Sequence, residues 1–548
     1  MAGQKADTPV LIIGGGPVGL ALALDLAWRG IRSTLIEREV STGATLLAKA
    51  NGLHERTMET CRRWGLVPEI VRVGFPPEHP GDSVYCTSMT GHFIGRSPIP
   101  SANNRPTPPE SPEKRQRCPQ YEFDPLLARA VKARGMTDIR YACEFIELAQ
   151  DTDGVTARVK DADTGETFTL RAEYLVGCDG AGSRVRGALG VPFEGRMLDF
   201  SLSAMIRIPN LAAHSPIPDG ERYILIGPDG AWGIMTSVDG RGIWRFTVVG
   251  SQERLDATRY DVRSDICRAL GSDAIPFEII RLIPWRRSQC VAASYCQGRV
   301  FLTGDSAHTT SPTGGHGMNT GIADAVALSW MLDARLRGWG GEHLLQAYDA
   351  ERRPIGLRNS ANAASNYQGW LEKSGYANVL IEGPEGEACR KEVGRRLVAS
   401  LHGEWNSTGI DLGFRYEGSP IIVPDGTPPT PDQPSEYIPT SRPGHRAPHA
   451  WLNDGRSTLD LFGRDFVLLR FGGASADTQA LERAARRVKL PLQTIDVREP
   501  HIADLYARAL VLVRPDGQVA WRGDMLPEHC ESLIDTVRGA ASSGAALT

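Results

Sequence analysis

The sequence predicts an α/β fold, in which a domain built on a parallel sheet is interrupted by a mostly antiparallel sheet and followed by a small α/β unit. Three observations predict this arrangement. Apolar runs within residues 10–13, 173–179 and 298–305 each lead into a glycine-containing turn, which is typical of buried parallel strands followed by helices. Short alternating segments fill residues 201–286, which favours an antiparallel sheet. A proline-rich stretch at residues 420–448 precedes the C-terminal part and indicates an extended linker.

Composition sets the limits on function. The 548 residues, 41% hydrophobic and 23% charged, are enough for two or three domains with large cores. The 61 basic and 65 acidic residues give a net charge of -4, so charge offers no basis for binding nucleic acid or an anionic membrane. The apolar run at residues 10–28 is broken by three consecutive glycines and Asp25, which favours a strand, turn and helix over a membrane span.

The cysteines and the N-terminus bear on location. No basic segment followed by an uninterrupted apolar stretch opens the chain, so no secretory signal is expected. The ten cysteines contain no CxxC pair and no zinc-like spacing, which favours free thiols in a reducing cytoplasm. We therefore expect a cytoplasmic protein without a metal site.

The first element is a strand at residues 10–13 that leads into a G-x-G-x-x-G turn and a helix. The first glycine permits the tight turn, the second lets the backbone approach a pyrophosphate, and the third lets the helix pack closely on the strand. A second strand at residues 33–36 ends at an acidic residue suited to ribose hydroxyls. The alternative is a glycine-rich turn without a ligand. The residues expected to bind a dinucleotide here are Gly14, Gly16, Pro17, Val18, Gly19, Glu37 and Arg38.

Two later turns repeat the pattern of an apolar strand followed by small residues. The strand in residues 173–178 ends at Asp179-Gly180, and the strand in residues 299–303 ends at Gly304-Asp305. A loop, SPTGGHGMN, then precedes a helical pattern at residues 322–336. For each aspartate, capping of a turn or helix is the alternative to ligand binding.

These three ordered motifs resemble those of the class A flavoprotein monooxygenases, the FAD-dependent aromatic hydroxylases of the phenol and 2,4-dichlorophenol hydroxylase branch. The resemblance implies that the first turn holds the ADP half of FAD and that Asp305 contacts the ribityl chain. It associates Asp179 with the dinucleotide and with use of NAD(P)H. It also implies that Gln120 contacts FAD and that Lys49 stands where a flavin-side arginine is usual.

The loop at residues 312–319 has a physical role of its own. Its glycines allow the backbone to lie against a flat ring, and a helix that begins near Asn319 would direct its positive end at that ring. Such a terminus stabilises the negative charge of a reduced flavin. For His308 and His316 we favour packing or hydrogen bonding over proton transfer. The residues expected to contact the cofactor here are Pro312, Gly315, Gly317, Met318 and Asn319.

The resemblance implies hydride transfer from NAD(P)H to FAD, reaction with O2, and attack of a flavin C4a-hydroperoxide on a phenolic or polycyclic aromatic substrate. The catalytic candidates are Pro312, which by resemblance faces the reactive edge of the ring, Asn51 and Trp285. Asn51 replaces an aspartate of the family, and the segment that begins at Trp285 also departs from the family pattern, so no base is assigned. Oxygen insertion beside a ketone, epoxidation, and a flavin-binding protein without turnover remain alternatives.

The antiparallel sheet is expected to cover the substrate. Its candidate apolar walls, for which a place in the core is the alternative, are Tyr223, Trp232, Met235, Trp244 and Trp285. Arg222 and Arg286 are candidates to meet a carboxylate, with a solvated surface position as the alternative. The expected partners are a small aromatic molecule and O2, and formation of a homodimer is left open.

The C-terminal part contains a strand at residues 466–471 and two strands joined by Pro515-Asp516-Gly517, which predicts a hairpin. It resembles the thioredoxin-like C-terminal domain of the phenol hydroxylase branch, but without CxxC, so an interface or stability role is expected. The predicted division is residues 1–200 for the first part of the FAD-binding domain, with excursions near 75–120; 201–286 for the substrate sheet; 287–419 for the rest of the FAD-binding domain and a helical region; 420–449 for the linker; and 450–548 for the last domain.

Overall fold

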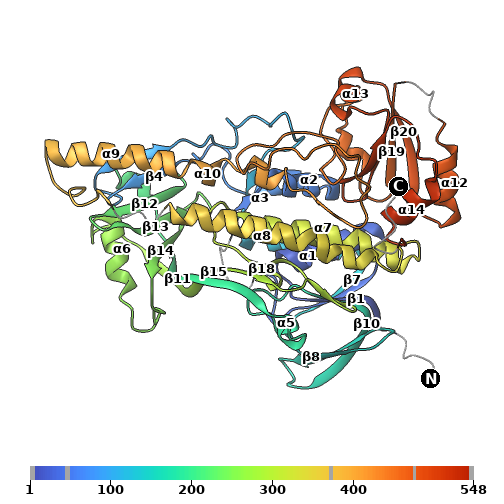
Figure 1. Cartoon of the computed structure of the whole chain (residues 1–548). Coiled ribbons are helices and arrows are strands. Elements are labelled where there is room, and N and C mark those ends of the chain that lie inside the picture. The colour runs from blue at the N-terminus through green and yellow to red at the C-terminus, as the bar shows by residue number, and fades with distance from the viewer. Residues whose placement is uncertain (1–5, 44–49, 370–373, 473–476, 542–548) are drawn as a thin grey trace.

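The computed structural model describes residues 6–43, 50–369, 374–472 and 477–541. It is a mixed α/β protein (Figure 1), as predicted. The second sheet and the C-terminal unit lie at opposite ends of the molecule, and the long helices α7 (His316–Leu336) and α8 (Ala347–Gln368) run between them. None of the helices in the described part of the chain has the length and apolar character needed to cross a membrane.

The first sheet has the predicted parallel centre. Its strand order is β16-β17-β10-β1-β2-β7, and all pairs from β17 to β7 are parallel. A hairpin of β8 (Cys143–Gln150) and β9 (Val155–Asp161) pairs with residues 167–172 of β10, ahead of the residues that pair with β17. The bounds of the six strands are β1 (Thr8–Ile13), β2 (Ser33–Ile36), β7 (Thr137–Arg140), β10 (Thr167–Gly177), β16 (Cys296–Gln297) and β17 (Val300–Leu302).

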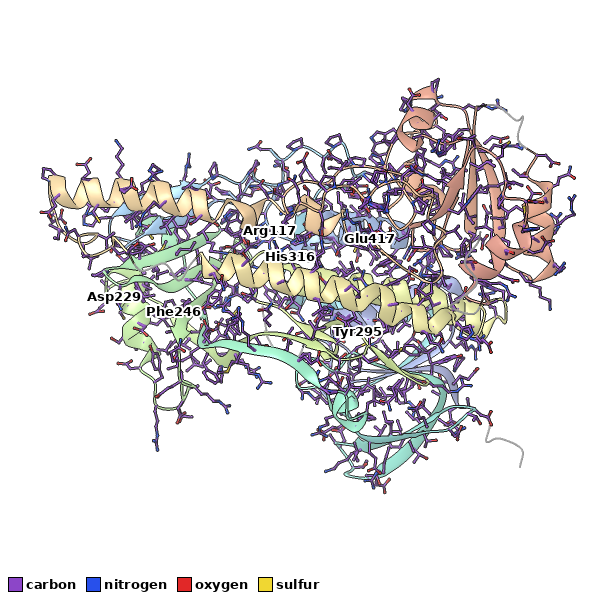
Figure 2. The ribbon with its side chains drawn as sticks, viewed as in Figure 1. Arg117, Asp229, Phe246, Tyr295, His316 and Glu417 are labelled. Carbon is purple, nitrogen blue, oxygen red and sulfur yellow. The ribbon has the colours of Figure 1, made fainter. Side chains whose placement is uncertain are left out.

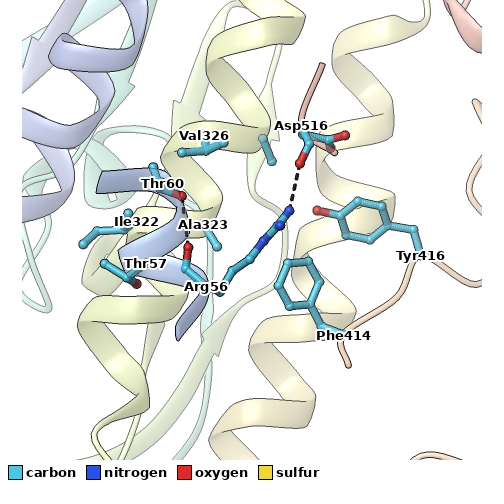
Figure 3. A pocket seen from close by; sticks show the side chains of 10 residues that line it. Arg56, Thr57, Thr60, Ile322, Ala323, Val326, Phe414, Tyr416 and Asp516 are labelled. Carbon is cyan, nitrogen blue, oxygen red and sulfur yellow. Dashed lines mark hydrogen bonds between the residues drawn. The ribbon is translucent and has the colours of Figure 1, made fainter. Parts of the chain in front are cut away.

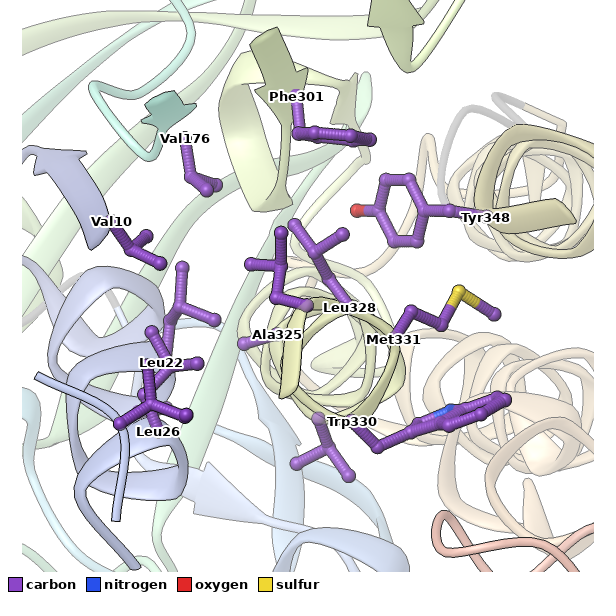
Figure 4. Close-up of a cluster of buried hydrophobic side chains, with 14 of the residues drawn as sticks. Val10, Leu22, Leu26, Val176, Phe301, Ala325, Leu328, Trp330, Met331 and Tyr348 are labelled. Carbon is purple, nitrogen blue, oxygen red and sulfur yellow. The ribbon is translucent and has the colours of Figure 1, made fainter. Parts of the chain in front are cut away.

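Helices pack on this sheet through a large apolar core. Side chains of β1 and β17, such as Val10 and Phe301, meet Leu22 of α1 (Pro17–Arg29) and Leu328 of α7 (Figure 4). All four side chains are fully buried, and burying a side chain of this size stabilises the fold by about 1.5–3 kcal/mol. The other helices of this part are α2 (Glu55–Trp64), α3 (Val67–Val73), α4 (Gln120–Arg134) and α5 (Arg184–Ala188).

The second sheet is mostly antiparallel, also as predicted. Its order is β18-β15-β11-β14-β13-β12-β4-β5, and β12 with β4 is its one parallel pair. The strands are β4 (Ser83–Cys86), β5 (Phe93–Ser97), β11 (Phe193–Arg207), β12 (Arg222–Gly227), β13 (Gly230–Ser237), β14 (Ile243–Ser251), β15 (Glu278–Ala292) and β18 (His308–Thr309). Two strands of this sheet therefore come from the excursion that precedes β11 in the chain.

The two faces of this sheet differ. The outer face packs on α6 (Val262–Leu270) through a core that includes Tyr223, Met235 and Trp244. The expectation that these three line the substrate site is therefore wrong, and the core alternative holds. Trp232 also lies on this side, with the Arg268 guanidinium 3.9 Å from its ring centre. Trp285 belongs to the inner face, where its Nε1 donates to Ser203 Oγ at 2.9 Å.

The C-terminal unit is a four-stranded sheet with helices. Its order is β20-β19-β21-β22, and β21 (Leu510–Val513) and β22 (Val519–Gly523) form the predicted hairpin. The other elements are β19 (Phe466–Phe471), β20 (Leu492–Val497), α12 (Gln479–Arg487), α13 (Pro500–Tyr506) and α14 (Cys530–Val537). Between α8 and this unit lie α9 (Pro384–Ser400), α10 (His402–Trp405) and α11 (Thr408–Asp411).

The proline-rich segment is extended but closely packed, and it does not act as a free spacer. Its backbone donates from Val423 to Ala520, from Gly444 to Val519, and from Ala447 to Gly517. These bonds attach the segment to the edge of the C-terminal sheet. Buried backbone N–H groups need partners, and the sheet edge supplies them for the non-proline residues of the segment. The side chain of Arg446 is buried and pairs with Glu59 of α2, so the segment joins the two units.

The C-terminal hairpin reaches the first domain. Arg514, fully buried, donates to both carboxylate oxygens of Glu351 in α8, at 2.5 and 2.9 Å. Arg56 of α2 donates to the Asp516 backbone oxygen at 2.8 Å, beside a cavity of about 20 Å³ (Figure 3). That volume holds about one water molecule.

Candidate cofactor and substrate site

The first glycine turn has the geometry of a dinucleotide-binding turn. Gly14 has φ 108°, and an added Cβ would lie 2.5 Å from the Cys178 oxygen. A Cβ at Gly19 would lie 2.0 Å from the Gly14 oxygen, so α1 packs closely on β1. At Gly16 nothing lies within 4 Å of the added atom. Two glycines are thus required by packing, and the third leaves room in front of the backbone.

The start of α1 faces that room. Gly16 is the N-cap and makes no side-chain cap, and no acidic residue stands in the first turn. The first N–H groups of a helix have no partner within the helix, and they attract anions. Pro17 stands at the first turn and Val18 packs against Gly304 and Gly321. This terminus fits a phosphate.

Glu37 and Arg38 have different surroundings. Glu37 is half-buried at the end of β2, where one carboxylate oxygen accepts from the Gly15 N–H and the other from the Glu39 N–H at 2.9 Å. A carboxylate has acceptor capacity beyond two bonds, so Glu37 is held against the glycine turn with capacity left for a ribose. The Arg38 side chain is 74% exposed, 3.7 Å from Glu39.

The three turn motifs meet at one edge of the first sheet. Ile13 of β1 pairs with Gly177 of β10, which pairs with Leu302 of β17. The turns that follow these parallel strands therefore lie side by side, at the edge where open α/β sheets bind ligands. Arg186 links two of them, since its Nη1 donates to the Ser306 oxygen at 2.7 Å and its Nη2 to the Ala181 oxygen at 2.9 Å. Sequence reasoning missed this arginine.

Asp179 and Asp305, the aspartates of the second and third turns, have different surroundings. Asp179 accepts from Ser183 Oγ at 2.5 Å and from the Val185 N–H at 3.1 Å, so it caps the start of α5. The capping alternative is thus realised for Asp179. Asp305 lies in a 3-10 turn between the buried residues Gly304 and Ser306, and is itself exposed. Asp305 is therefore placed to accept hydrogen bonds from a molecule in the crevice.

The loop before α7 is held by Asn319. Helix α7 begins at His316, three residues before the predicted start near Asn319, because Gly314 (φ 90°) and Gly315 (φ 71°) already end the loop. The Asn319 Oδ1 accepts from the His54 N–H at 2.9 Å and from Thr57 Oγ1 at 2.7 Å. Its Nδ2 donates to the oxygens of Gly52 at 3.0 Å and Gly315 at 2.9 Å. The amide is saturated, so Asn319 positions this loop.

The backbone of the same helix start is available to a ligand. Gly315 is the N-cap without a side-chain cap, and no acidic residue stands in the first turn. The N–H groups of Gly317 and Met318 belong to the first turn, where none has a partner within the helix. Pro312 is exposed between the buried residues Ser311 and Thr313.

Two further segments pair with each other beside the start of α7. Cys118 donates its N–H to the Asn51 oxygen at 2.8 Å, and Gln120 donates its N–H to the Ala50 oxygen at 3.0 Å. The Gln120 amide donates to Asp124 Oδ2 at 3.0 Å. The buried Oδ1 of Asn51 has no hydrogen-bond partner among the described residues. Lys49 lies outside the described residues.

The centre of the inner face of the second sheet is polar. Arg222, Thr236 and Arg245 are neighbours across β12, β13 and β14. Because cross-strand partners share a face, the three side chains stand together. Burial, followed by the charges of Arg222 and Arg287, lowers the pKa of Arg245 to about 10.

The adjacent arginines on β15 face opposite ways. Arg286 is exposed, whereas Arg287 is buried and lies 3.4 Å from Asp199 and 3.0 Å from Ser311 Oγ. The inward arginine is therefore Arg287, whereas Arg286 takes the solvated surface position. Arg222 pairs with Glu404 at 2.7 Å and is half-buried, so its solvated alternative is wrong.

The two histidines singled out above are both buried. His308 Nε2 lies 2.7 Å from Asp324, whose other oxygen accepts from Arg352 Nε at 2.7 Å. His316 lies in the interior of the molecule (Figure 2), with its Nδ1 3.5 Å from Asp411. His54 Nδ1 lies 2.7 Å from the same Asp411 oxygen. Sequence reasoning missed His54 and Asp411, which are 357 positions apart.

These residues do not form a convincing cation site. The donor atoms of His54, His316 and Asp411 lie within 4.8 Å of one another. However, the second Asp411 oxygen accepts from Ser407 Oγ at 2.8 Å and lies 3.4 Å from Arg115. The positive charge of Arg115 at that distance would repel a metal cation.

The residues at this edge of the sheet fit FAD. Open space at Gly16, an exposed carboxylate at Asp305, uncapped N–H groups on α7 and the Asn51 oxygen, which has no partner among the described residues, provide separate contacts for a ligand. Such a set of contacts at the ends of parallel strands is typical of a dinucleotide-binding domain.

Comparison with known proteins gives the family. The chain matches the FAD binding domain over residues 7–363 and the C-terminal domain of aromatic-ring hydroxylases over residues 440–541. It belongs to the FAD-dependent aromatic-ring hydroxylases, and is an FAD-dependent aromatic monooxygenase.

Three similar proteins illustrate the range of the family. A putative polyketide hydroxylase of Streptomyces halstedii is 34% identical, with 98% of each chain covered. The 2,4-dichlorophenol 6-monooxygenase of Delftia acidovorans is 31% identical, covering 94% of this chain and 95% of its own. The solved structure of the rebeccamycin biosynthetic enzyme RebC with reduced flavin is 39% identical, with a TM-score of 0.89, covering 98% of this chain and 100% of the other.

Proposed function

We propose that the protein hydroxylates a polyketide-like or other polycyclic aromatic compound with O2, and that NAD(P)H is the reductant. The observation that carries this proposal is the meeting of three turns at one sheet edge, with uncapped helix starts at Gly16 and Gly315. The similarity to a polyketide hydroxylase supports a substrate of that class.

Each part of the crevice has a proposed task. The N–H groups at the start of α1 bind the pyrophosphate, Glu37 accepts from the adenosine ribose, and Asp305 accepts from the ribityl hydroxyls. The N–H groups of Gly317 and Met318 donate to the carbonyl end of the flavin, where they stabilise negative charge. FAD supplies the two-electron reduction and the activation of O2. The route of oxygen transfer given for the family stays a prediction.

The inner face of the second sheet is proposed to cover the substrate. It shields the site from water, and the rigid strands orient the aromatic ring toward the loop at Pro312. The guanidinium groups of Arg222, Arg245 and Arg287 influence one another, which supports a substrate that carries an acidic or phenolic oxygen. Asn51 is proposed to orient a ligand through hydrogen bonds, because an amide does not take up a proton at ordinary pH. Trp285 is proposed as the aromatic wall, since its ring lies on this face.

The proposal is tested with the purified protein. We expect a yellow protein whose consumption of NAD(P)H rises when a polycyclic aromatic acid or phenol is added, with a product heavier by one oxygen atom. Bound flavin that NAD(P)H does not bleach would contradict it. A product whose ring is expanded or epoxidised would assign the chain to the alternative oxygenations instead. Homodimer formation and a cytoplasmic location stay predictions, to be checked by light scattering and cell fractionation.

A further inference from the structure

His54 and Asp411 form a buried pair behind the crevice. His54 directly precedes α2 and is 5% exposed, and Asp411 at the end of α11 is 8% exposed. The Nδ1 of His54 lies 2.7 Å from Asp411 Oδ1. A carboxylate at Nδ1 fixes the ring orientation and favours a proton on that nitrogen, so the opposite nitrogen, Nε2, is the one left to act.

The Nε2 atom is directed at the two backbone segments that flank the crevice. An added Cβ at Gly315, the N-cap of α7, would lie 3.3 Å from His54 Nε2, and one at Gly52 would lie 3.8 Å away. Gly52 follows Asn51, and Gly315 precedes the uncapped turn of α7. Among the residues that the structure describes, the side-chain hydrogen bond recorded for His54 is the one between Nδ1 and Asp411. A polar atom in a side chain buried to this extent normally has a partner.

The groups around the pair keep Asp411 ionised. Arg115 lies 3.0 Å from Glu55 and 3.4 Å from Asp411, and His316 stands on the other side with its ring centre 5.6 Å from that of His54. Arg105 interacts in turn with Arg115 and Glu55, so two guanidinium groups face two carboxylates. Burial alone would raise the pKa of Asp411, but His54 and His316 hold it well below its usual value. The charged carboxylate is therefore available to fix the orientation of the His54 ring.

We propose that His54, oriented by Asp411, is a further cofactor-contacting residue, whose Nε2 donates a hydrogen bond to the carbonyl end of FAD. The inference rests on FAD binding at the three turns as proposed above. Reduction adds two electrons and one proton to the ring as a hydride from NAD(P)H, so the reduced ring can carry a negative charge. A hydrogen bond to a charged acceptor is stronger than one to the neutral oxidised ring.

The decisive measurement is the affinity for oxidised and for reduced FAD, together with the midpoint potential of the bound flavin. His54→Phe keeps a ring of similar size but has no N–H donor. It should bind reduced FAD about tenfold more weakly, as expected for loss of a hydrogen bond to a charged group, while oxidised FAD changes by less than about threefold. The midpoint potential should therefore be lower in His54→Phe than in the wild-type protein.

Two further variants separate this role from a structural one. Asp411→Asn keeps the imidazole but removes the carboxylate that orients it, so it should lower the midpoint potential by less than His54→Phe does. His343→Gln removes an imidazole that is 40% exposed at the surface, and should match the wild type. A wild-type midpoint potential in His54→Phe would overturn the inference while leaving FAD binding intact. A wild-type protein that binds no FAD would instead overturn the proposed placement of the cofactor.

Discussion

Gly16 and Gly19 belong to one turn, yet an added methyl group would meet opposite surroundings at the two positions. At Gly19 it would collide with the Gly14 backbone, and at Gly16 it would enter empty space. The spacing of the motif predicted the turn but not this difference, because it depends on how closely α1 lies against the Gly14 backbone. Gly16 is therefore the position at which ligand binding can be changed without changing the fold.

We predict that Gly16→Val binds FAD about 10- to 100-fold more weakly, because the side chain occupies the place of the pyrophosphate and breaks one or more charge-assisted hydrogen bonds. Its melting temperature without FAD should fall only slightly, because valine is a poorer N-cap than glycine but meets no other atom there. Gly19→Ala is the matched control, and should lower the melting temperature in the absence of FAD. Flavin fluorescence and calorimetry measure the two effects, and tight FAD binding by Gly16→Val would show that the open space is not the phosphate site.

Asp25 is a charged residue in the otherwise apolar first helix. It is fully buried and accepts from Arg63 at 2.7 Å, Trp64 Nε1 at 2.9 Å and Arg29 Nε at 3.1 Å. Burial raises the pKa of its carboxyl, but the charges of Arg63 and Arg29 outweigh burial and lower it to about 2. The Asp25 carboxyl therefore joins α1 to α2. In the sequence, Asp25 was visible only as a charged residue that breaks an apolar run.

Because the folded pKa of Asp25 is lowered from 3.8 to about 2, its contribution to stability is present above pH 4 and is lost as the pH falls toward 2. We predict that Asp25→Asn loses about 2 kcal/mol of stability at neutral pH and has a flatter dependence of stability on pH between about 4 and 2. Denaturant unfolding at several pH values measures this. If the stability of Asp25→Asn fell between pH 4 and pH 2 as steeply as that of the wild type, Asp25 would not be the cause of the loss of stability in acid.

At the scale of the element, the strands of the second sheet separate a core face from a polar face. Alternation along β15 distinguishes Arg286 from Arg287, but only pairing with β11 shows which of the two faces inward. The same holds for Tyr223, Met235 and Trp244, whose residue types suit a core and a pocket equally. Local motifs such as the three turns were predictable, because their chemistry is contained in a few consecutive residues.

We predict that Arg245→Met raises the KM for an aromatic acid by about tenfold, since it removes a charge-assisted contact, and leaves the KM for a neutral aromatic within about twofold. Arg286→Met, an exposed neighbour of the same chemistry, is the control and should change neither value. Steady-state kinetics with a matched acid and methyl ester measures the difference. If Arg245→Met raised the KM for the acid and for its methyl ester equally, Arg245 would have no part in recognising the carboxylate.

At the scale of the whole molecule, buried ion pairs join the C-terminal unit to the first domain. Arg514 meets Glu351 and Asp516, and Arg446 meets Glu59, with all of these side chains buried. Aromatic packing of Phe466 against Trp330 and Trp339 lies beside them. The sequence could not give these contacts, because the partners are far apart in the chain and lie in elements whose docking is not encoded locally.

We predict that Arg514→Met costs about 3 kcal/mol or more in unfolding free energy, because it leaves the buried Glu351 carboxylate without its partner. Arg508→Met, which removes an exposed pair with Asp524, should cost less than about 1 kcal/mol. Thermal unfolding of the two variants side by side makes the comparison. Equal melting temperatures would mean that the C-terminal unit contributes little to the stability of the first domain.

The hydrogen bond from Arg56 to the Asp516 backbone oxygen has a consequence for how the active protein is assembled. The next residue, Thr57, donates to Asn319, so one short segment of α2 touches both the C-terminal hairpin and the loop proposed to hold the flavin. If the chain were divided after residue 418, the larger fragment would lack the contact between Arg56 and the C-terminal hairpin. We expect such a fragment to take up FAD only once the smaller fragment has joined it.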